Sequence, residues 1–286
     1  MAITTAPVLL SKPTPSMPLR YGLFQAAVGP RDLPVHARNG GLQYVHALCG
    51  EGFGYEIACI GDQASKADSF EAGLNTVLGA PFIVYATVTC GTVGYTSDEL
   101  RSFVVERLKG VEQSVVEQVL STGDFGQAPG LTAADGIVTV TGAGTTAVEV
   151  VSELERAMYC GFDTTVSNYG PPAYLHMAIP VFNELKSQHL IEFDGTRWRT
   201  PLGTVVSTGC YANNDPDGDP AADGTFWVYI TGQTTVWRTG DSEIFVPPIE
   251  GALNRATNQV TMIAEREYVV TYECDGFAKA VTLWTA

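Results

Sequence analysis

The feature of this sequence that most constrains its fold is one long amphipathic helix near the middle of the chain. Thr96 and Glu99 have the Thr-x-x-Glu spacing of a capping box, in which each side chain accepts a hydrogen bond from the backbone N–H of the other residue. Apolar residues then recur at spacings of three and four as far as Leu120, and Gly123 supplies a C-terminal stop. This pattern predicts a helix over residues 97–121, roughly 37 Å long at 1.5 Å per residue.

A helix of this length needs an equally long surface to pack on. Its narrow apolar stripe is compatible with a coiled coil, but about three heptads and the interior glycine at position 110 favour packing on a sheet. Gly110 also leaves two interpretations open, namely a bend in the helix or a close approach to a neighbouring segment.

The rest of the body alternates between strands and shorter helices. A second capping box at Thr146 and Glu149 begins a helix that ends before Gly161. Pro180 lies in the first turn of a third helix, one face of which is formed by Val181, Phe182, Leu185 and His189. The order predicts an α+β fold. Runs of strand-forming residues cover 41–60, 81–95, 137–140, 173–178, 203–211, 225–238 and 260–273.

The first 38 residues are rich in proline and show no periodicity, which predicts an extended arm without a helix or a central strand. Residues 1–50 contain four basic groups and one acid, Asp32, so their net charge is 4 − 1 = +3. Since the whole chain has a net charge of −15, the remaining residues have a net charge of −18. The polar stretch between residues 60 and 80 predicts a long projecting hairpin. The basic groups are Lys12, Arg20, Arg31 and Arg38.

Charge and composition exclude several classes of protein. Asp and Glu number 31 against 16 Lys and Arg, so a basic coat for nucleic acid is absent. No apolar run approaches the length of a membrane span, and the start has no signal-peptide core, which predicts a protein made and retained in a cytoplasm without membrane contact. Only 16% of residues are charged, and this low density predicts a surface covered by partners.

The cysteines and histidines show no motif for a metal, a cofactor or a redox reaction. The six cysteines are widely spaced, and we interpret them as small core residues rather than disulfide partners. His46 lies three residues before Cys49, which leaves a Cys–His nucleophile pair as an alternative. No group of acids, bases and nucleophiles converges, so the sequence predicts a protein that is not an enzyme and needs no cofactor.

An acidic stretch at 213–219 resembles the first half of a calcium-binding loop. Asn213, Asp215 and Asp217 alternate before Gly218, but Gly224 stands where such a loop needs a bidentate glutamate. We therefore interpret the stretch as an exposed loop.

The order of these elements, together with their local sequences, resembles one known family. PFIVYATVTCGTVGYTSDELRSFVVERLKGVEQSVVEQVLSTG resembles the passage from an extended loop into a spine helix, and AYLHMAIPVFNELKSQHL resembles a strand-helix unit. FDGTRWRTPLGTVVSTG resembles the turn and strand that follow, and NQVTMIAEREYVVTYECDGFAKAVTLW resembles the closing strand with its Ala-x-Arg and Gly-Phe-Ala. The family is the major capsid protein of tailed double-stranded DNA bacteriophages, with the Hong Kong 97-like fold.

The resemblance implies a four-part subunit. An N-terminal arm would cover 1–38, and an extended-loop hairpin with its base 39–95. A peripheral domain would cover 96–144 and 249–286, with the spine helix at 97–121, and an axial domain 145–248.

The resemblance also implies a function. Such subunits would assemble into hexamers and pentamers of an icosahedral phage head that encloses double-stranded DNA without reading its sequence. A portal and a separate scaffolding protein would be partners, and the protein would be made in the bacterial host cytoplasm and reside in the virion. Two alternatives are an encapsulin-like shell of a bacterial nanocompartment and, in a different class, a cytosolic enzyme or a phage tail or adaptor protein.

Several residues acquire expected roles from the resemblance. Some relatives join a loop lysine to a neighbour's asparagine, which here would require Lys66 and either Asn254 or Asn258, although a single lysine in a polar loop is more commonly just solvated. Gly110 would bend the spine helix differently in precursor and expanded shells.

Charge suggests how the subunit would face in such a shell. Since packaged phosphates repel acid, we expect the acidic loop on the outside, and the basic arm towards the interior or across an acidic patch of a neighbour. The alternative is that the arm is a tether whose charges are incidental. The acids of the loop are Asp215, Asp217, Asp219 and Asp223.

Overall fold

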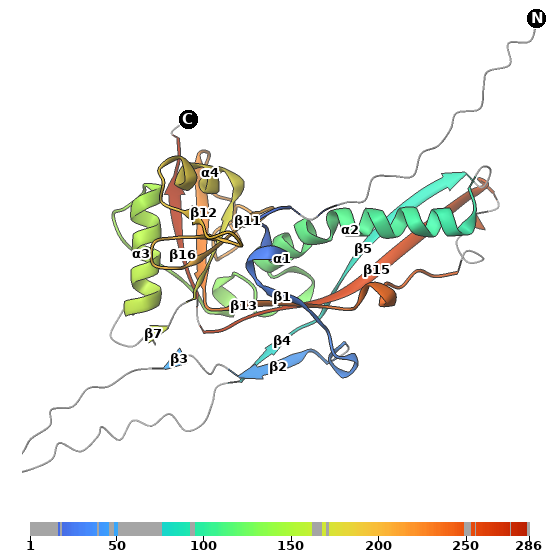
Figure 1. The fold of residues 1–286 in the computed structure, drawn as a ribbon, viewed down its shortest axis with the longest axis horizontal. Coiled ribbons are helices and arrows are strands. Elements are labelled where there is room, and N and C mark those ends of the chain that lie inside the picture. Colours follow the sequence, from blue (N-terminus) through green and yellow to red (C-terminus); the bar gives the residue numbers. More distant parts are fainter. Residues whose placement is uncertain are drawn as a thin grey trace, which may run out of the picture.

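The computed structural model of the chain describes residues 17, 19–38, 40–45, 49–50, 76–91, 95–161, 168–169, 172–248, 253–254, 256–274 and 276–284. These residues form a five-stranded and a seven-stranded sheet, together with two small two-stranded sheets. The helix α2 (Ser97–Thr122) is the longest in the described part of the chain, and it runs along the five-stranded sheet with its C-terminal end near the other lobe (Figure 1). We call the five-stranded sheet with α2 the first lobe, and the seven-stranded sheet with its helices the second lobe.

The long strand β15 (Gln259–Tyr272) organises the first lobe. It pairs antiparallel with β5 (Phe82–Gly91) over Gln259–Tyr268, and beyond that point it pairs with β13 (Thr234–Arg238). The remaining strands of this sheet are β1 (Val28–Asp32), which pairs with β13, and β14 (Leu253–Asn254), which pairs with β15.

Alternation of side chains along β5 and β15 explains why the helix lies on this sheet. The inward positions Phe82, Val84 and Ala86 of β5 are buried, as are the inward positions Val260, Met262 and Ala264 of β15. They share one core cluster with Leu100, Val104 and Leu108 of α2. The expected packing of the helix on a sheet is therefore confirmed.

The predicted ends of the first two helices are confirmed within one residue. Thr96 and Glu99 make both hydrogen bonds of the capping box, and Gly123 ends α2 in the left-handed region at φ 69°. Thr146 and Glu149 make the same two bonds at the start of α3 (Ala147–Cys160). The third predicted helix is α4 (Ile179–Ser187), with Pro180 in its first turn. The expectation that His189 lies on this helix is wrong, because α4 ends before it and His189 has a positive φ of 56°.

The second lobe places helices on both faces of its sheet. Val228, Ile230 and Phe277 share a core cluster with α3 and α4. Tyr229 and Ala278, at alternate positions of the same strands, belong instead to the cluster that contains α2. The strand order is β6 (Ile137–Thr139), β16 (Gly276–Thr282), β12 (Thr225–Thr231), β8 (Tyr174–Ala178), β11 (Val205–Gly209), β10 (Trp198–Arg199) and β9 (Glu192–Phe193).

Short elements complete the described part. β2 (Leu42–Val45) pairs with β4 (Thr76–Gly79), which gives the base of the expected hairpin, while residues 51–75 lie outside the described residues. β3 (Cys49–Gly50) pairs with β7 (Asn168–Tyr169). The single turns are α1 (Leu23–Ala26), η1 (Val35–Ala37), η2 (Asp124–Gly126), η3 (Ala133–Asp135) and η4 (Asp241–Glu243).

Three segments join the sheets in ways that the sequence did not indicate. The run 225–238 is not one strand, because the chain bends at Gly232 and Gln233 and passes from β12 in the second lobe to β13 in the first. The expected peripheral segment 249–286 likewise divides, since β15 lies in the first sheet and β16 in the second. β6, which we expected in the peripheral segment 96–144, also pairs in the second sheet.

The expectation of an arm without a helix is wrong for residues 23–26, whereas β1, as an edge strand, agrees with the expectation that the arm has no central strand. The turn α1 buries Leu23, Phe24 and Ala26, and β1 forms the edge strand of the first sheet. Local proline content excluded a long helix, but it did not exclude one turn that is stabilised by burial.

The interpretation of every cysteine as an unpaired core residue is also wrong. Cys274 takes part in a disulfide bond. Cys160 and Cys210 are free but exposed, so they are not core residues. No helix among the described residues is long and apolar enough to cross a bilayer.

Candidate functional site

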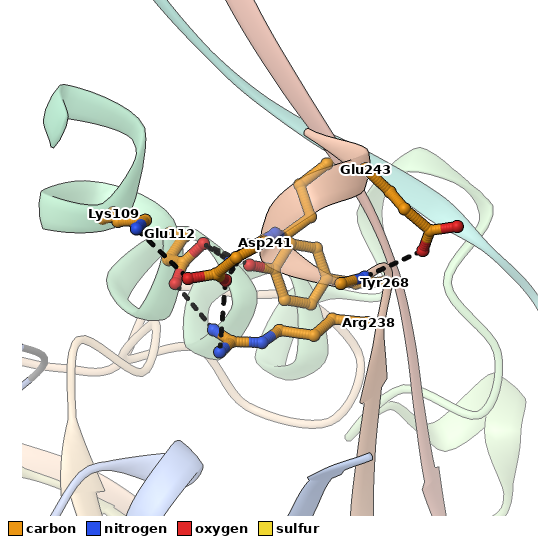
Figure 2. Close-up of polar contacts among 8 residues, drawn as sticks. Lys109, Glu112, Arg238, Asp241, Glu243 and Tyr268 are labelled. Carbon is orange, nitrogen blue, oxygen red and sulfur yellow. Dashed lines mark hydrogen bonds and ion pairs between the residues drawn. The ribbon is translucent and has the colours of Figure 1, made fainter. Parts of the chain in front are cut away.

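A buried cluster of ion pairs joins the long helix to the sheet below it (Figure 2). Arg266 takes an inward position on β15 and is only 1% exposed, and its Nη1 lies 2.8 Å from Oε2 of Glu112 on α2. The hydroxyl of Tyr268 donates to the same oxygen at 2.6 Å, and Arg238 Nη1 donates to Oε1 at 2.9 Å. Every oxygen of this buried carboxylate is thus paired, as a buried charge requires.

Asp241 of η4 adds a second carboxylate to the cluster and contacts both Arg266 and Lys109. Its carboxylate accepts from Arg266 and lies 3.1 Å from Lys109 Nζ. Burial would raise the pKa of this carboxyl, but the hydrogen bonds from Arg266 and Lys109 outweigh it, so the pKa is lowered. We call Lys109, Glu112, Arg238, Asp241, Arg266 and Tyr268 the helix anchor.

The N-terminal segment joins the same region through Arg38. Its guanidinium lies 2.5 Å from Glu243 and 3.9 Å from Glu267. Arg20 and Arg31 lie over the rings of Tyr21 and Trp237, at 5.1 and 5.4 Å from the ring centroids. Three of the four expected arm charges therefore contact their own chain, and Lys12 lies outside the described residues.

The face of the first sheet that points away from α2 exposes large apolar side chains. Ile83 and Tyr85 take outward positions on β5 and are 53% and 63% exposed. Phe245 is 59% exposed and pairs with Glu265, which in turn pairs with Tyr85. We call Ile83, Tyr85, Phe245 and Glu265 the outer sheet face. An apolar group of this kind indicates a surface for a partner.

Two of the expected cross-link residues lie together on the β14–β15 hairpin. Asn254 is exposed, and its Oδ1 accepts from the backbone N–H of Ala256 at 3.0 Å. Asn258 is also exposed and has a positive φ of 52°. Lys66 lies outside the described residues, so the pairing stays a prediction.

Gly110 is exposed, and α2 continues through it without a break. Lys109 and Glu112 of the helix anchor lie on either side of it. The expected bend therefore stays a prediction, now placed at the point where the helix is held to the sheet.

The acidic loop is organised by hydrogen bonds of its own. Asp215 Oδ1 accepts from the backbone N–H groups of Asp217 and Asp219 at 3.0 and 2.8 Å, which is the geometry of an Asx turn. Asp217, Asp219 and Asp223 are exposed. No group of residues that could hold a metal ion occurs in the described part of the chain.

The histidines that the structure describes have no common site. His176 is fully buried and contacts Tyr211 and Thr231, whereas His189 is exposed. His46 and the side chain of Cys49 lie outside the described residues, so the structure does not test that pair.

The sequence did not predict the helix anchor, although it contained signals for it. Arg266 stands where the alternation of a half-buried strand requires an inward residue, and Glu112 follows the same inward stripe of the helix as Leu108. Because a buried charge needs a partner of opposite sign, an inward arginine on the strand and an inward glutamate on the helix indicate that these two faces pack against each other.

A long helix lies along an elongated sheet that continues into a second lobe of strands and helices, and this arrangement is the Hong Kong 97-like fold. No protein-family model matches the chain, and no curated protein matches it.

Solved structures match it over nearly its whole length. The capsid of Ralstonia phage GP4 has a TM-score of 0.55 at 10% identity, with 99% of this chain and 96% of that chain covered. The capsid of an empty GTA particle has a TM-score of 0.52 at 15% identity, covering 99% and 94%. The SrpI encapsulin from Synechococcus elongatus PCC 7942 has a TM-score of 0.51 at 11% identity, covering 98% and 94%. The expected α+β fold is confirmed.

Proposed function

We propose that this protein is the major capsid protein of a tailed double-stranded DNA bacteriophage, which assembles into hexamers and pentamers of an icosahedral head. The observation that carries the proposal is the correspondence of fold with the capsid of Ralstonia phage GP4 over 99% of the chain. A protein of this fold acts as a structural subunit rather than as an enzyme.

The exposed surface supports assembly. Tyr85 and Phe245 expose aromatic rings on a rigid sheet, and aromatic residues are enriched where protein interfaces carry most of their binding energy. Only 16% of the residues are charged, which reduces the desolvation cost of large subunit contacts.

Partners follow from the same proposal. The head would enclose double-stranded DNA without sequence readout, and it would need a portal and, for assembly, a separate scaffolding protein. The formal charge of −15 favours a subunit that turns its acidic groups away from packaged phosphates.

A second candidate is the shell of a bacterial nanocompartment, which the match to the SrpI encapsulin favours. The two candidates differ in what surrounds the gene and in what fills the shell. Neighbouring portal and terminase genes would support the phage head, whereas a neighbouring gene for a cargo enzyme would support the nanocompartment.

The direct test is to express the full chain and examine it by negative-stain electron microscopy. We expect closed shells or capsomers for the parent protein and unassembled subunits for the double variant Tyr85→Glu and Phe245→Glu. Thr87→Ser, a small change on the same outward side of β5, is the matched control and should assemble like the parent. A parent protein that stays monomeric, both alone and with a scaffolding protein, would contradict the proposal.

A further inference from the structure

Residues 19–27, which we call the strap, lie across the junction of the two lobes. Leu23 and Phe24 belong to the core cluster that contains α2, where the ring of Phe24 stacks on Tyr268 of the first lobe at 6.0 Å. Ala26 instead packs with Tyr174 and Val205 of the second lobe. Successive residues of one short segment therefore fill the cores of both lobes.

Polar contacts tie the strap to the second lobe at both of its ends. The carbonyl oxygen of Tyr21 accepts from the backbone N–H of Thr208 on β11 at 3.1 Å. The carbonyl oxygen of Ala27 accepts from Arg197 Nη2 at 3.1 Å. Immediately afterwards, β1 pairs with β13 of the first lobe, so the same stretch of chain is fixed to both sheets.

The Glu117 carboxylate joins the strap, the long helix and the second lobe at one point. It lies on α2 and is fully buried. Its Oε1 accepts from the backbone N–H of Leu23 and from Gln113 Nε2, both at 2.9 Å. Its Oε2 accepts from the backbone N–H of Cys210, at the end of β11, at 2.7 Å. Leu23 and Cys210 lie 94 and 93 residues from Glu117 along the chain.

Two glycines make this approach possible. A Cβ at Gly22 would lie 1.6 Å from Gln113 Nε2 and 2.7 Å from Glu117 Oε1. A Cβ at Gly209 would lie 2.0 Å from Glu117 Oε2. A side chain at either position must therefore displace the carboxylate or its neighbour from the hydrogen bonds that they make.

The carboxylate pairs with N–H groups and with no basic side chain in the described part of the chain. Burial raises the pKa of Glu117, and the bonds from Leu23, Cys210 and Gln113 only partly offset this effect. A buried charge held in this way costs free energy, so its position at the junction is a feature that packing alone does not explain.

We propose that the strap, fastened by Glu117, acts together with α2 to hold the two lobes at a fixed angle within one subunit. Residues from Leu19 onward then belong to the body of the subunit, unlike the freely extended arm that composition alone suggested. This inference concerns the single chain, and it stands whether the assembled particle is a phage head or a nanocompartment.

The first experiment measures amide hydrogen exchange in the full chain for the parent and for two variants, Glu117→Gln and Gly22→Ala. Glu117→Gln replaces one acceptor oxygen by a donor that faces an N–H group, and Gly22→Ala displaces Gln113 and the carboxylate. We expect exchange of the Leu23 and Cys210 amides to rise by about ten-fold or more, because each hydrogen bond is either lost or loses its charged acceptor. Amides of β12 and β15 should keep their protection.

Gly40→Ala is the matched control, since a Cβ at Gly40 meets nothing nearer than a backbone oxygen at 4.0 Å. It should leave exchange unchanged. Unaltered exchange in both variants, or an equal rise throughout both lobes, would overturn the proposal, because the strap would then have no local role.

A second experiment measures the angle between the lobes. Spin labels attached through non-cysteine chemistry at the exposed Arg101 on α2 and Arg156 on α3, in chains diluted with unlabelled protein, report one intrachain distance distribution. We expect a narrow distribution for the parent and for Gly40→Ala, and a broader one for Glu117→Gln. A strap that exchanges faster while this distribution stays narrow would also overturn the proposal.

Discussion

His176 is a fully buried residue whose ring nitrogens contact only neutral hydroxyl groups. Nδ1 lies 3.2 Å from the Tyr211 hydroxyl and Nε2 lies 2.9 Å from the Thr231 hydroxyl. Burial lowers the pKa of His176 to about 3, because the charged form loses its hydration. The imidazole is therefore neutral in the folded subunit at ordinary pH.

This residue makes stability depend on acid. In the unfolded chain His176 becomes protonated near the ordinary imidazole pKa of 6.5, whereas in the folded chain its pKa is about 3. Stability is therefore fully present above pH 6.5 and falls as the pH drops towards 3. Urea unfolding of dissociated subunits should show a contribution of about 3 kcal/mol lost between about pH 7 and about pH 4. His176→Gln should lose this part of the pH dependence, and an unchanged slope in the variant would contradict the assignment.

Arg266 gives a second prediction at the scale of one residue. Arg266→Met removes the central cation of the helix anchor and leaves Glu112 buried with fewer partners, which should cost about 3–5 kcal/mol in urea unfolding. Arg38→Met, which removes a cation from a partly exposed pair with Glu243, should cost much less. An equal loss of unfolding free energy in the two variants would show that burial does not determine how much each ion pair contributes to stability.

At the scale of elements, α2 links the two lobes because its first half packs on β5 and β15 and its second half reaches the second sheet. The helix anchor holds it near Lys109 and Glu112, and Glu117 holds it farther along. The exposed Gly110 lies among these fixed points, where the helix has no side chain.

Replacement of Gly110 tests the expected bend. Gly110→Ala should stabilise an exposed helix interior by about 1 kcal/mol and resist bending. If the bend takes part in expansion of precursor heads, the variant should expand more slowly, which time-resolved light scattering or electron microscopy would measure. Expanded heads at an unchanged yield and rate would refute the bend and leave Gly110 as a site of close packing.

At the scale of the whole molecule, three of the four N-terminal basic groups contact their own chain, whereas composition suggested that they lie on neighbouring subunits or towards the interior of a shell. Deletion of residues 1–30 would remove Leu23, Phe24 and Ala27 from the core, so it should abolish the folded subunit as well as assembly. The role of the arm charges therefore needs a test that leaves the core intact.

Neutralisation of Lys12 and Arg20 to glutamine supplies that test. If these charges hold neighbouring subunits together, the variant should assemble with less dependence on salt, because ion pairs are screened over about 10 Å at 0.1 M. Arg156→Gln, on the exposed side of α3, is the control. The same salt dependence in the variant and the parent would show that the arm charges are incidental.

The acidic loop tests how the chain would face in the proposed shell. We expect Asp215, Asp217, Asp219 and Asp223 on the outer surface, so a short epitope inserted after Asp217 should bind its antibody on intact particles. An epitope that is reached only after the particles are broken would place this loop inside or within a subunit contact.

The sequence by itself determined the elements whose signals are local. Both capping boxes join residues three apart, Pro180 marks the first turn of α4, and the Asx turn at Asp215 uses its own neighbours. Such contacts form from adjacent residues, so a pattern of a few positions predicts them.

Only the tertiary structure decided which sheet each strand joins and which polar groups are buried. The bend at Gly232 sends β12 and β13 to different lobes, and the carboxylates of Glu112 and Glu117 meet donors 154 and 94 residues away. The strap, residues 19–27, likewise packs in the cores of both lobes through residues that are distant in the chain. Strand pairing and the burial of charge depend on partners distant in the chain, and local periodicity carries no information about which distant partners will meet.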